Sequence, residues 1–189
     1  MKYGKNFLRE KFLLQRKKQN INTRKFNFNL ILKLINKNFG KKKVIIAAYY
    51  PANKEVNIIN FLKKISKKKF KILLPVIKPS QAMCFKYWNF KDPLYVNSFG
   101  ILEPKKTNKE LTPDIVLVPL VAFDNNLNRI GYGKGYYDRK LARLKKNNKK
   151  IISIGLAYSF QKYQNIPTSK YDFKLDYIFT EQGIISSNQ

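Results

Sequence analysis

Glycines alternate in the segment 131–135, which is the part of this sequence best equipped for chemistry. An apolar run ending at Pro119 precedes the segment, cations stand at Arg129 and Lys134, and a carboxylate follows at Asp138. A buried strand, a glycine-rich turn and a helix start in this order bind anions, because backbone amides and the helix N-terminus face the ligand. The pattern predicts a site for a phosphate group together with its metal ion.

The glycine segment matches neither of the two common nucleotide-binding motifs. GxxxxGK[ST] is absent, and the third glycine of GxGxxG would fall at Tyr136. A second interpretation remains open, in which the glycines only permit positive φ in a tight turn between a strand and a helix. In that case Arg129, Lys134 and Asp138 would have no role in binding.

The sequence contains no histidine, which restricts the chemistry that it can perform. Ser-His and Cys-His pairs and histidine-ligated metals are excluded. Proton transfer must use carboxylates, lysine, tyrosine or the substrate itself. A divalent metal would be a hard ion such as Mg²⁺, held by carboxylates and phosphate oxygens.

Hydrophobic periodicity predicts helices that alternate with short apolar strands. The expected helices span residues 2–20, 23–39, 58–65 and 135–144. The expected strands span residues 44–49, 70–76, 83–88, 115–118, 151–157 and 177–180, and residues 92–113 are mostly loop. This alternation predicts an α/β fold, a three-layer Rossmann-like domain with a largely parallel central sheet. We expect a single domain over residues 1–189, with the N-terminal helices (2–39) packed on the α/β core.

Composition favours a soluble protein that does not enter a membrane. The chain has 189 residues, of which 44% are apolar, enough for one good core. The longest apolar stretches, 44–52 and 115–123, are far shorter than the roughly 20 residues of a membrane helix. The lone cysteine, Cys84, fits a reducing compartment, so we expect a cytoplasmic location.

The net charge of +28 has two explanations. Lysine dominates the basic residues and is scattered along the chain with many asparagines and isoleucines, which indicates drift in composition. A functional surface for nucleic acid is the alternative, and a non-catalytic lysine-rich RNA-binding protein is the second functional hypothesis. No arginine-rich stripe or aromatic RNA-binding signature accompanies the lysines, so we expect no specific nucleic-acid partner.

Several segments together resemble a known enzyme family. The central motif is Arg129 to Arg139, and the other matching segments follow the order of the family. They are Lys5 with Leu8 and Arg9, Tyr50 and Pro51 with Glu55, Leu74 to Val76, Met83 and Phe85, Gly100 to Pro104, and Tyr171 to Glu181. The ordered set resembles 5-formyltetrahydrofolate cyclo-ligases, also called methenyltetrahydrofolate synthetases.

The resemblance implies an ATP- and Mg²⁺-dependent ring closure. ATP phosphorylates the formyl oxygen of 5-formyltetrahydrofolate, N10 attacks the activated carbon, and phosphate leaves. The products are 5,10-methenyltetrahydrofolate, ADP and phosphate. The implied partner is this folate, with or without a polyglutamate tail, and we expect a monomer.

The resemblance also implies which residues form the site. Arg129 and Lys134 would act in catalysis, Tyr50 and Glu55 would contact the folate, and Asp138 and Asp172 would hold the metal. The implied ATP-binding positions are Lys5, Asn6, Phe7, Leu8, Arg9, Arg129, Ile130, Gly131, Tyr132, Gly133, Lys134, Gly135, Tyr136 and Tyr137.

The residue types alone leave other roles open for several of these positions. Lys5 and Arg9 could be solvated side chains of a basic helix. Glu55 could be an acid near a helix N-terminus, favoured by the helix dipole, and Asp172 could cap a turn. The chain also has Tyr171 where many family members carry histidine.

Overall fold

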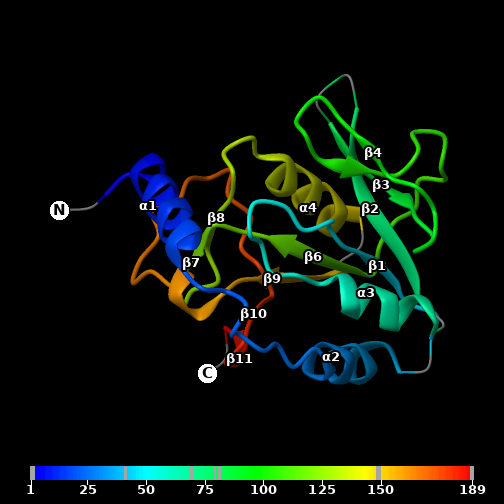
Figure 1. Ribbon diagram of the computed structural model, residues 1–189, viewed down its shortest axis with the longest axis horizontal. Helices are drawn as coiled ribbons and strands as arrows, with labels where there is room; N and C mark the ends of the chain where they lie inside the picture. Colours follow the sequence, from blue (N-terminus) through cyan, green and yellow to red (C-terminus); the bar gives the residue numbers. More distant parts are fainter. Residues whose placement is uncertain are drawn as a thin grey trace.

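The computed structural model describes residues 3–40, 42–68, 70–78, 80, 82–147 and 150–187, which form an α/β fold (Figure 1). Within these residues the main sheet has seven strands in the order β11-β10-β9-β6-β1-β2-β3. The strands are β1 (Ile45–Ala47), β2 (Lys71–Ile77), β3 (Met83–Tyr87), β6 (Ile115–Pro119), β9 (Ile152–Leu156), β10 (Tyr177–Thr180) and β11 (Gly183–Ser186).

The five inner strands of this sheet run parallel to one another. Ile46 of β1 lies opposite Ile72 of β2 on one side and opposite Ile115 of β6 on the other. The edge strands β3 and β11 pair antiparallel with β2 and β10. The sheet is therefore mixed but mostly parallel, which confirms the expected fold class.

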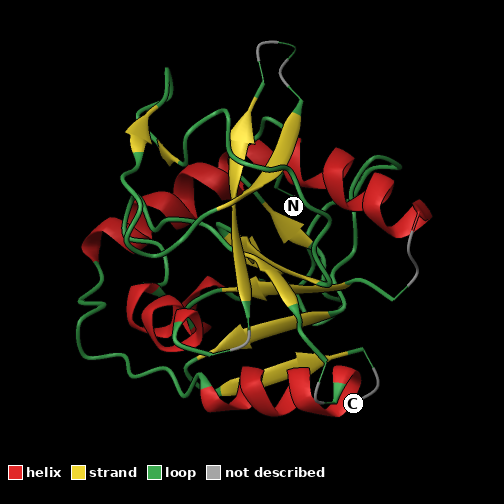
Figure 2. Cartoon of the chain, turned by 90° about the vertical axis from the view of Figure 1, so that its right-hand side faces the viewer, coloured by secondary structure: helices red, strands yellow, loops and turns green. Residues whose placement is uncertain are grey.

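Helices cover both faces of the sheet. Ile115 and Leu117 of β6 pack in the core beneath α2 (Asn29–Phe39) and α3 (Ile59–Ser66), whereas the alternating Val116 and Val118 pack beneath α4 (Tyr136–Asn147). Successive strand side chains point to opposite faces, so an all-apolar strand such as β6 requires cover on both. Figure 2 shows the resulting layers of helix, sheet and helix.

The first helix, α1 (Lys5–Lys18), packs against a hairpin rather than the main sheet (Figure 1). Leu8 and Phe12 form a small core with β7 (Ala122–Phe123) and β8 (Arg129–Ile130). The sequence predicted neither strand of this hairpin, because two-residue strands are too short to show a periodicity. The hairpin brings the start of the chain beside the glycine segment.

The N-terminal helices are shorter than predicted. The first was expected over residues 2–20, of which residue 2 lies outside the described residues, and it spans 5–18. The second was expected from residue 23 and begins at Asn29. Side chains of Asn20 and Asn27 accept hydrogen bonds from the amides two residues on, which favours turns over helix. The expected single-domain organisation stays a prediction.

Several short elements were not predicted. They are β4 (Tyr95–Val96), β5 (Leu102–Glu103), the hairpin β7–β8, a 3₁₀ turn at Ser159–Gln161 and the edge strand β11. By contrast, β10 has the predicted bounds, and β2, β3, β6, β9, α3 and α4 begin within one residue of prediction. Elements of two or three residues depend on tertiary pairing rather than on their own sequence pattern.

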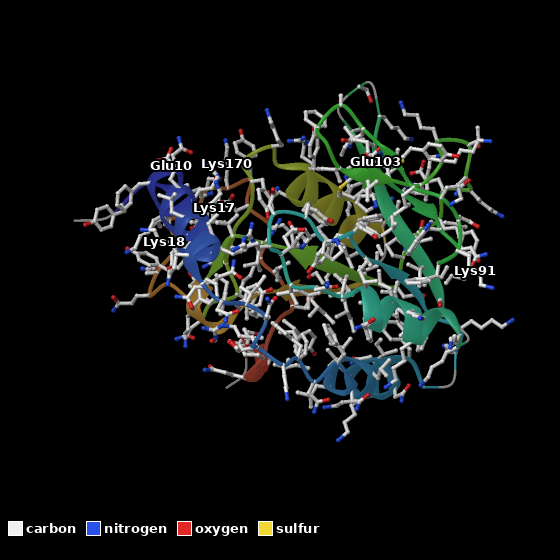
Figure 3. All side chains as sticks on the ribbon, in the orientation of Figure 1. Glu10, Lys17, Lys18, Lys91, Glu103 and Lys170 are labelled. Atoms are coloured by element: carbon white, nitrogen blue, oxygen red, sulfur yellow. The ribbon has the colours of Figure 1, made fainter. Side chains whose placement is uncertain are left out.

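The basic side chains are spread over the molecule. Figure 3 shows Lys17 and Lys18 on α1 at one end and Lys91 at the other. This distribution fits the explanation by composition better than a single nucleic-acid surface. Among the described residues, no helix is both long enough and apolar enough to cross a membrane.

Candidate active site

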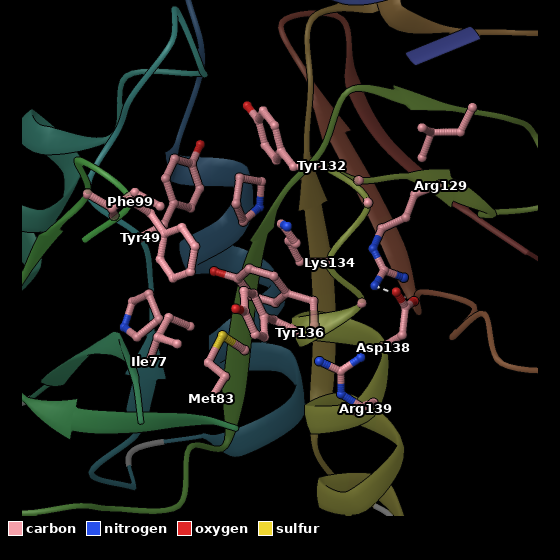
Figure 4. Close-up of a pocket in the computed structure, with 18 of the residues that line it drawn as sticks. Tyr49, Ile77, Met83, Phe99, Arg129, Tyr132, Lys134, Tyr136, Asp138 and Arg139 are labelled. Atoms are coloured by element: carbon pink, nitrogen blue, oxygen red, sulfur yellow. Dashed lines mark hydrogen bonds and ion pairs between the residues drawn. The ribbon is translucent and has the colours of Figure 1, made fainter. Parts of the chain in front are cut away.

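A cavity of about 510 Å³ opens where the central parallel strands end (Figure 4). Tyr49 and Tyr50 follow β1, Ile77 ends β2 and Pro119 ends β6, and all of them line the cavity. Ligands of open α/β sheets bind outside the carboxyl ends of the strands, where the connections to the helices leave a crevice. The cavity therefore lies where this fold binds its ligands.

The glycine loop, residues 131–135, joins β8 to α4 and forms one wall of the cavity. Gly133 and Gly135 have φ of +95° and +65°, in the region that favours glycine. A Cβ at Gly135 would lie 2.7 Å from Nη1 of Arg139. The turn therefore requires glycine, as one of the two interpretations of the sequence proposed.

The same loop also has the properties of an anion site. In the described part of the chain, the backbone amides of residues 132–135 donate no hydrogen bond. They lie at the N-terminus of α4, where the helix dipole favours negative charge. Lys134 is exposed, lines the cavity and forms no ion pair with any described residue (Figure 4). The loop therefore offers free donors and one free cation to a ligand.

Two further cations reach the cavity from α1. Lys5 and Arg9 are one helical turn apart, so both face the cavity. Arg9 Nε donates to the carbonyl of Gly131 at 2.8 Å and Nη1 donates to Asn6 at 2.6 Å. Lys5 forms an ion pair with Asp172. Both side chains thus have defined partners and are not simply solvated.

The residues between these cations point elsewhere. Asn6 only supports Arg9, Phe7 stacks on Tyr3 with ring centroids 4.4 Å apart, and Leu8 is buried in the core under α1. None of the three lines the cavity, because side chains on a helix rotate by about 100° per residue. Of the five implied ATP-binding positions from Lys5 to Arg9, only Lys5 and Arg9 therefore line the cavity.

Arg129 is hydrogen-bonded to two segments of the cavity wall. Its Nη2 donates to Oδ1 of Asp138 at 2.7 Å, and its Nη1 donates to the carbonyl of Phe173 at 2.5 Å. The amide of Phe173 also donates to Oδ1 of Asp138, at 3.1 Å. Burial lowers the pKa of Arg129 and the charge of Asp138 raises it, and a guanidinium stays charged at neutral pH in either case. This network connects β8, α4 and the segment before β10.

Asp138 and Asp172 both line the cavity, and each keeps one free oxygen. Lys5 and the amide of Ser169 bond to Oδ2 of Asp172, while Oδ1 of Asp138 accepts from Arg129. Oδ2 of Asp138 and Oδ1 of Asp172 accept no hydrogen bond from the described residues. No group of three or more Asp, Glu, Cys or His suited to a metal occurs among them. One or two carboxylates completed by phosphate oxygens are what Mg²⁺ needs, so the residues fit this ion.

Glu55 is buried beside the glycine loop. Oε1 accepts from the hydroxyl of Tyr132 at 2.7 Å and Oε2 accepts from the amide of Ala52 at 3.0 Å. Burial raises the pKa of Glu55, and these bonds together with the charge of Arg16 act in the opposite direction. Since α3 begins only at residue 59, Glu55 does not lie in its first turn, and the carboxylate instead bonds to the cavity wall.

Aromatic and apolar side chains form the side of the cavity that faces the basic residues (Figure 4). Tyr50, one of the expected folate contacts, lies here with its ring 6.5 Å from Trp88. No binding role was predicted for the other members, although Met83, Ile101 and Glu103 lie in segments that match the family. These members are Tyr49, Ile77, Met83, Phe99, Ile101 and the carboxylate of Glu103. Phe99, an aromatic residue beside a loop glycine, suggests stacking on folate, but it was left out of the predicted site because an aromatic residue in a loop more often belongs to the core.

The hydroxyl of Tyr137 is the remaining notable group of the site. It is buried and finds no hydrogen-bond partner in the described part of the chain. Burial raises the pKa of Tyr137, so it stays a neutral donor. Buried hydroxyls are nearly always bonded, so this group fits a polar atom of a ligand.

The fold and the cavity define an α/β protein in which a glycine loop with basic side chains faces an aromatic wall. Comparison with known families makes the assignment narrower. Residues 1–181 match the model of the 5-formyltetrahydrofolate cyclo-ligase family. The chain belongs to this family and is an enzyme of the ligase class, which confirms the resemblance and the enzyme class inferred from its motifs.

Individual relatives agree with this assignment. The chain is 35% identical over 136 residues to the 5-formyltetrahydrofolate cyclo-ligase of Haemophilus influenzae, covering 69% of this chain and 72% of the relative. It is 33% identical over 183 residues to the enzyme of that name from Mycoplasma genitalium, covering 92% and 96%.

Solved structures extend the likeness to the fold. The 5,10-methenyltetrahydrofolate synthetase of Aquifex aeolicus superimposes with a TM-score of 0.79 at 28% identity, covering 98% of this chain and 93% of the other. A synthetase of the same name from Mycoplasma pneumoniae gives 0.70 at 26% identity, covering 98% and 100%. The similarity thus spans the sheet, the helices and the loops of the cavity.

Proposed function

We propose that this chain catalyses the ATP- and Mg²⁺-dependent conversion of 5-formyltetrahydrofolate to 5,10-methenyltetrahydrofolate. The observation that carries the proposal is a single cavity with two unlike sides. One side is the glycine loop with its cations and carboxylates, and the other is aromatic. The triphosphate of ATP is an anion that suits the basic side, and the pterin ring of the folate is a flat heterocycle that suits the aromatic side. The cavity therefore suits both substrates next to each other.

The reaction would proceed in two steps. The formyl oxygen attacks the γ-phosphorus of ATP, forming an O–P bond and releasing ADP. N10 then attacks the formyl carbon and a C–N bond forms. N10 loses its proton to the departing phosphate or to water, and the C–O bond breaks to release phosphate with the former formyl oxygen. The formyl group needs no strong enzymic base once it is phosphorylated, which is compatible with a chain that has no histidine.

The basic side would position the phosphates. Loop amides of residues 132–135 would donate to phosphate oxygens, and Arg129, Lys134, Lys5 and Arg9 would supply positive charge. Phosphoryl transfer depends mainly on such positioning and on neutralising charge. Asp138 and Asp172 would hold Mg²⁺, which neutralises charge on the phosphate oxygens when it is bound.

The aromatic side would position the folate. Glu55 and Tyr50 are the expected contacts, and Phe99 is added because its half-exposed ring lines the cavity, 6.5 Å from Tyr136. Aromatic side chains stack on flat heterocycles, and a carboxylate accepts strong hydrogen bonds from an N–H-rich edge. This side would therefore hold the formyl group toward the loop.

A direct assay tests the proposal. Purified protein receives 5-formyltetrahydrofolate, ATP and Mg²⁺, and the near-ultraviolet absorbance of the methenyl product is followed. We expect a rise that needs ATP and stops when EDTA removes the metal. Folded protein that gives no ATP-dependent rise would disprove the activity, and a rise that persists in EDTA would disprove the role of Mg²⁺.

We further propose that the enzyme acts as a monomer in the cytoplasm without a specific nucleic-acid partner. Light scattering after size exclusion gives the oligomeric state. RNA binding through scattered lysines would weaken with salt by a log–log slope of about −0.7 for each phosphate contacted on single strands. Tight RNA binding that resists salt would instead favour the alternative of an RNA-binding protein.

A further inference from the structure

Arg16 is a buried arginine in α1 that contacts the cavity wall from behind. It is only 2% exposed and does not line the cavity. Its Nη2 donates to the hydroxyl of Tyr132 at 2.6 Å, its Nη1 donates to the carbonyl of Leu120 at 3.3 Å, and its guanidinium lies 5.7 Å from the centroid of the Tyr132 ring. A buried charge is costly unless it is paired, so its partners give it a specific task.

The hydrogen bonds around Tyr132 have a fixed direction. A guanidinium only donates, so the Tyr132 hydroxyl must accept from Arg16. Its own proton is then free for the other contact, which is Oε1 of Glu55 at 2.7 Å. The second oxygen of Glu55 accepts from the amide of Ala52. A chain of bonds thus runs from a cation through a hydroxyl to a carboxylate anchored at both oxygens.

The chain of bonds crosses parts of the fold that are distant in sequence. Arg16 belongs to α1, Tyr132 to the glycine loop and Glu55 to the connection between β1 and α3. Asn53 and Lys54, just before Glu55, have positive φ of 48° and 56°, and the amide of Glu55 closes this turn by donating to the carbonyl of Ala52 at 2.8 Å. The three segments are therefore held together at the wall that both substrates would share.

Among the described residues, Arg16 is the only cation whose charge acts on the pKa of Glu55. Burial raises this pKa, while the bond from Tyr132, the amide of Ala52 and the charge of Arg16 lower it. The other titratable groups that face Glu55 from β1, α4 and the segment after β9 are neutral tyrosines, namely Tyr49, Tyr137 and Tyr158. Arg24 and Lys54 line a neighbouring hollow together with Glu55, yet the charge of neither acts on this pKa.

We propose that Arg16 is a positioning residue, which acts through the Tyr132 hydroxyl to hold Glu55 as an oriented anion in the wall of the cavity. The role of Glu55 toward the folate rests on the proposed function. The ordering of Tyr132 and Glu55 by Arg16 does not, since it depends only on the bonds described above.

A titration that needs no substrate tests the ordering. The chain has five glutamates, so labelling glutamate with ¹³C at the carboxyl carbon gives few signals, and Glu55→Gln assigns that of Glu55. We expect Arg16→Gln and Tyr132→Phe to move the Glu55 titration to higher pH, and Arg16→Lys to restore it in part. An unchanged titration in both Arg16→Gln and Tyr132→Phe would overturn the proposal.

Arg24→Gln is the matched control for the loss of an arginine. Arg24 lies in the segment after α1 and pairs with Glu181, and its charge does not act on the pKa of Glu55. This variant should leave the Glu55 titration unchanged even where it lowers stability. Tyr132→Phe keeps the ring and removes only the hydroxyl, so it still tests the proposal if Arg16→Gln does not fold.

Kinetics connect the ordering to the reaction. In Arg16→Gln and Tyr132→Phe, KM for 5-formyltetrahydrofolate should rise on the order of tenfold, with a smaller change in KM for ATP. The acid limb of kcat/KM should move to higher pH together with the titration. A shifted titration with unchanged folate KM would overturn the kinetic part alone, and an inactive wild-type enzyme would disprove the proposed function but not the ordering.

Discussion

The two sides of the cavity are built by different means. On the basic side the arginines are bonded to other polar groups, as Arg9 is to Gly131 and Arg129 is to Asp138, and the glycine loop keeps its donors free of bonds to any described residue. On the aromatic side, Phe99 and Ile101 are 49% and 39% exposed. Transfer of a phosphoryl group needs charges in fixed positions, whereas stacking of an aromatic side chain on a flat ring tolerates movement. Under the proposed function, the preorganised side would hold ATP and the more adaptable side would hold the folate.

The aromatic side nevertheless has one polar support. Asn97 accepts from the amides of Phe99 and Ile101 at 2.9 and 3.0 Å, and its own amide donates to Glu103 at 2.6 Å. Glu103 also accepts from the amide of Ile77 at 3.0 Å, which ties the loop to the end of β2. The backbone of this loop is thus anchored while its side chains stay exposed.

The largest effect on activity is expected at Arg129, which supplies charge to the site and also supports its structure. Arg129→Ala removes a buried cation and leaves Asp138 without its partner, so we expect a loss in kcat of about 10²–10³ and a loss of about 3 kcal/mol in the free energy of unfolding. Steady-state kinetics and urea unfolding measure the two. Arg129→Lys is the control that retains charge but not the two-pronged geometry. Near-normal kcat in Arg129→Ala would mean that this side is not preorganised for catalysis.

Lys134→Ala separates charge from structure on the same side. Because Lys134 is exposed and forms no ion pair within the described residues, unfolding should change by less than about 0.5 kcal/mol. Loss of its phosphate contact should cost roughly 1.5–3 kcal/mol, a ten- to hundredfold fall in kcat/KM. Lys146→Ala, in the last turn of α4, makes the same charge change far from the loop. If both variants behave alike, Lys134 has no specific role.

Phe99→Ala tests the adaptable side. We expect KM for the folate to rise roughly fivefold, which corresponds to a loss of about 1 kcal/mol in binding free energy, with KM for ATP nearly unchanged. Tyr95→Ala is a suitable control, since Tyr95 is 51% exposed nearby but does not line the cavity. An equal rise in both KM values for Phe99→Ala would contradict a division of the cavity between the two substrates.

The smallest effect on activity concerns a carboxylate outside both sides of the cavity. Burial opposes ionisation of Glu181, but hydrogen bonds from Ser159 and Arg24 outweigh it and lower its pKa. A carboxylate whose pKa is lower in the folded protein stabilises the fold at pH values above its pKa in the unfolded chain. This stabilisation is lost as the pH falls through the pKa of the folded protein. Glu181→Gln should therefore lose about 1–2 kcal/mol at pH 7 and show a smaller difference from wild type in acid, with kcat unchanged.

Urea unfolding at pH 7 and below pH 4 measures this difference. Glu110→Gln is the control, since its carboxylate pairs with Lys78 at an exposed position, where an ion pair contributes little. A Glu181 variant with wild-type stability at both pH values would contradict the stabilising role. A large loss of activity would mean that Glu181 influences the cavity after all.

The candidate site was predicted in part because its chemistry is concentrated in one segment. Glycines, Arg129, Lys134 and Asp138 lie within ten residues of one another, and their local order predicts the loop. Lys5, Glu55 and Asp172 came only from the family resemblance, since each alone fits a solvated or capping side chain. Their roles toward ATP, folate and metal stay predictions.

The contacts of the site could not be predicted from spacing. Arg16 and Tyr132 are 116 residues apart, and Lys5 and Asp172 are 167 apart. No local periodicity relates such pairs, because they meet only after the β7–β8 hairpin has placed α1 beside the glycine loop. Apart from Tyr50, the aromatic side was missed for the same reason, because it combines the ends of three strands with a loop.

By itself the sequence determined the alternation of strands and helices, the glycine loop and the family. These depend on local patterns of apolar residues, on φ preferences and on an ordered set of motifs, all of which are carried by neighbouring residues. Only the tertiary structure decided which cations reach the cavity, which oxygens stay free and how Arg16 is connected to Glu55. Long-range packing sets these contacts, since burial and hydrogen bonding depend on segments that the chain brings together only on folding.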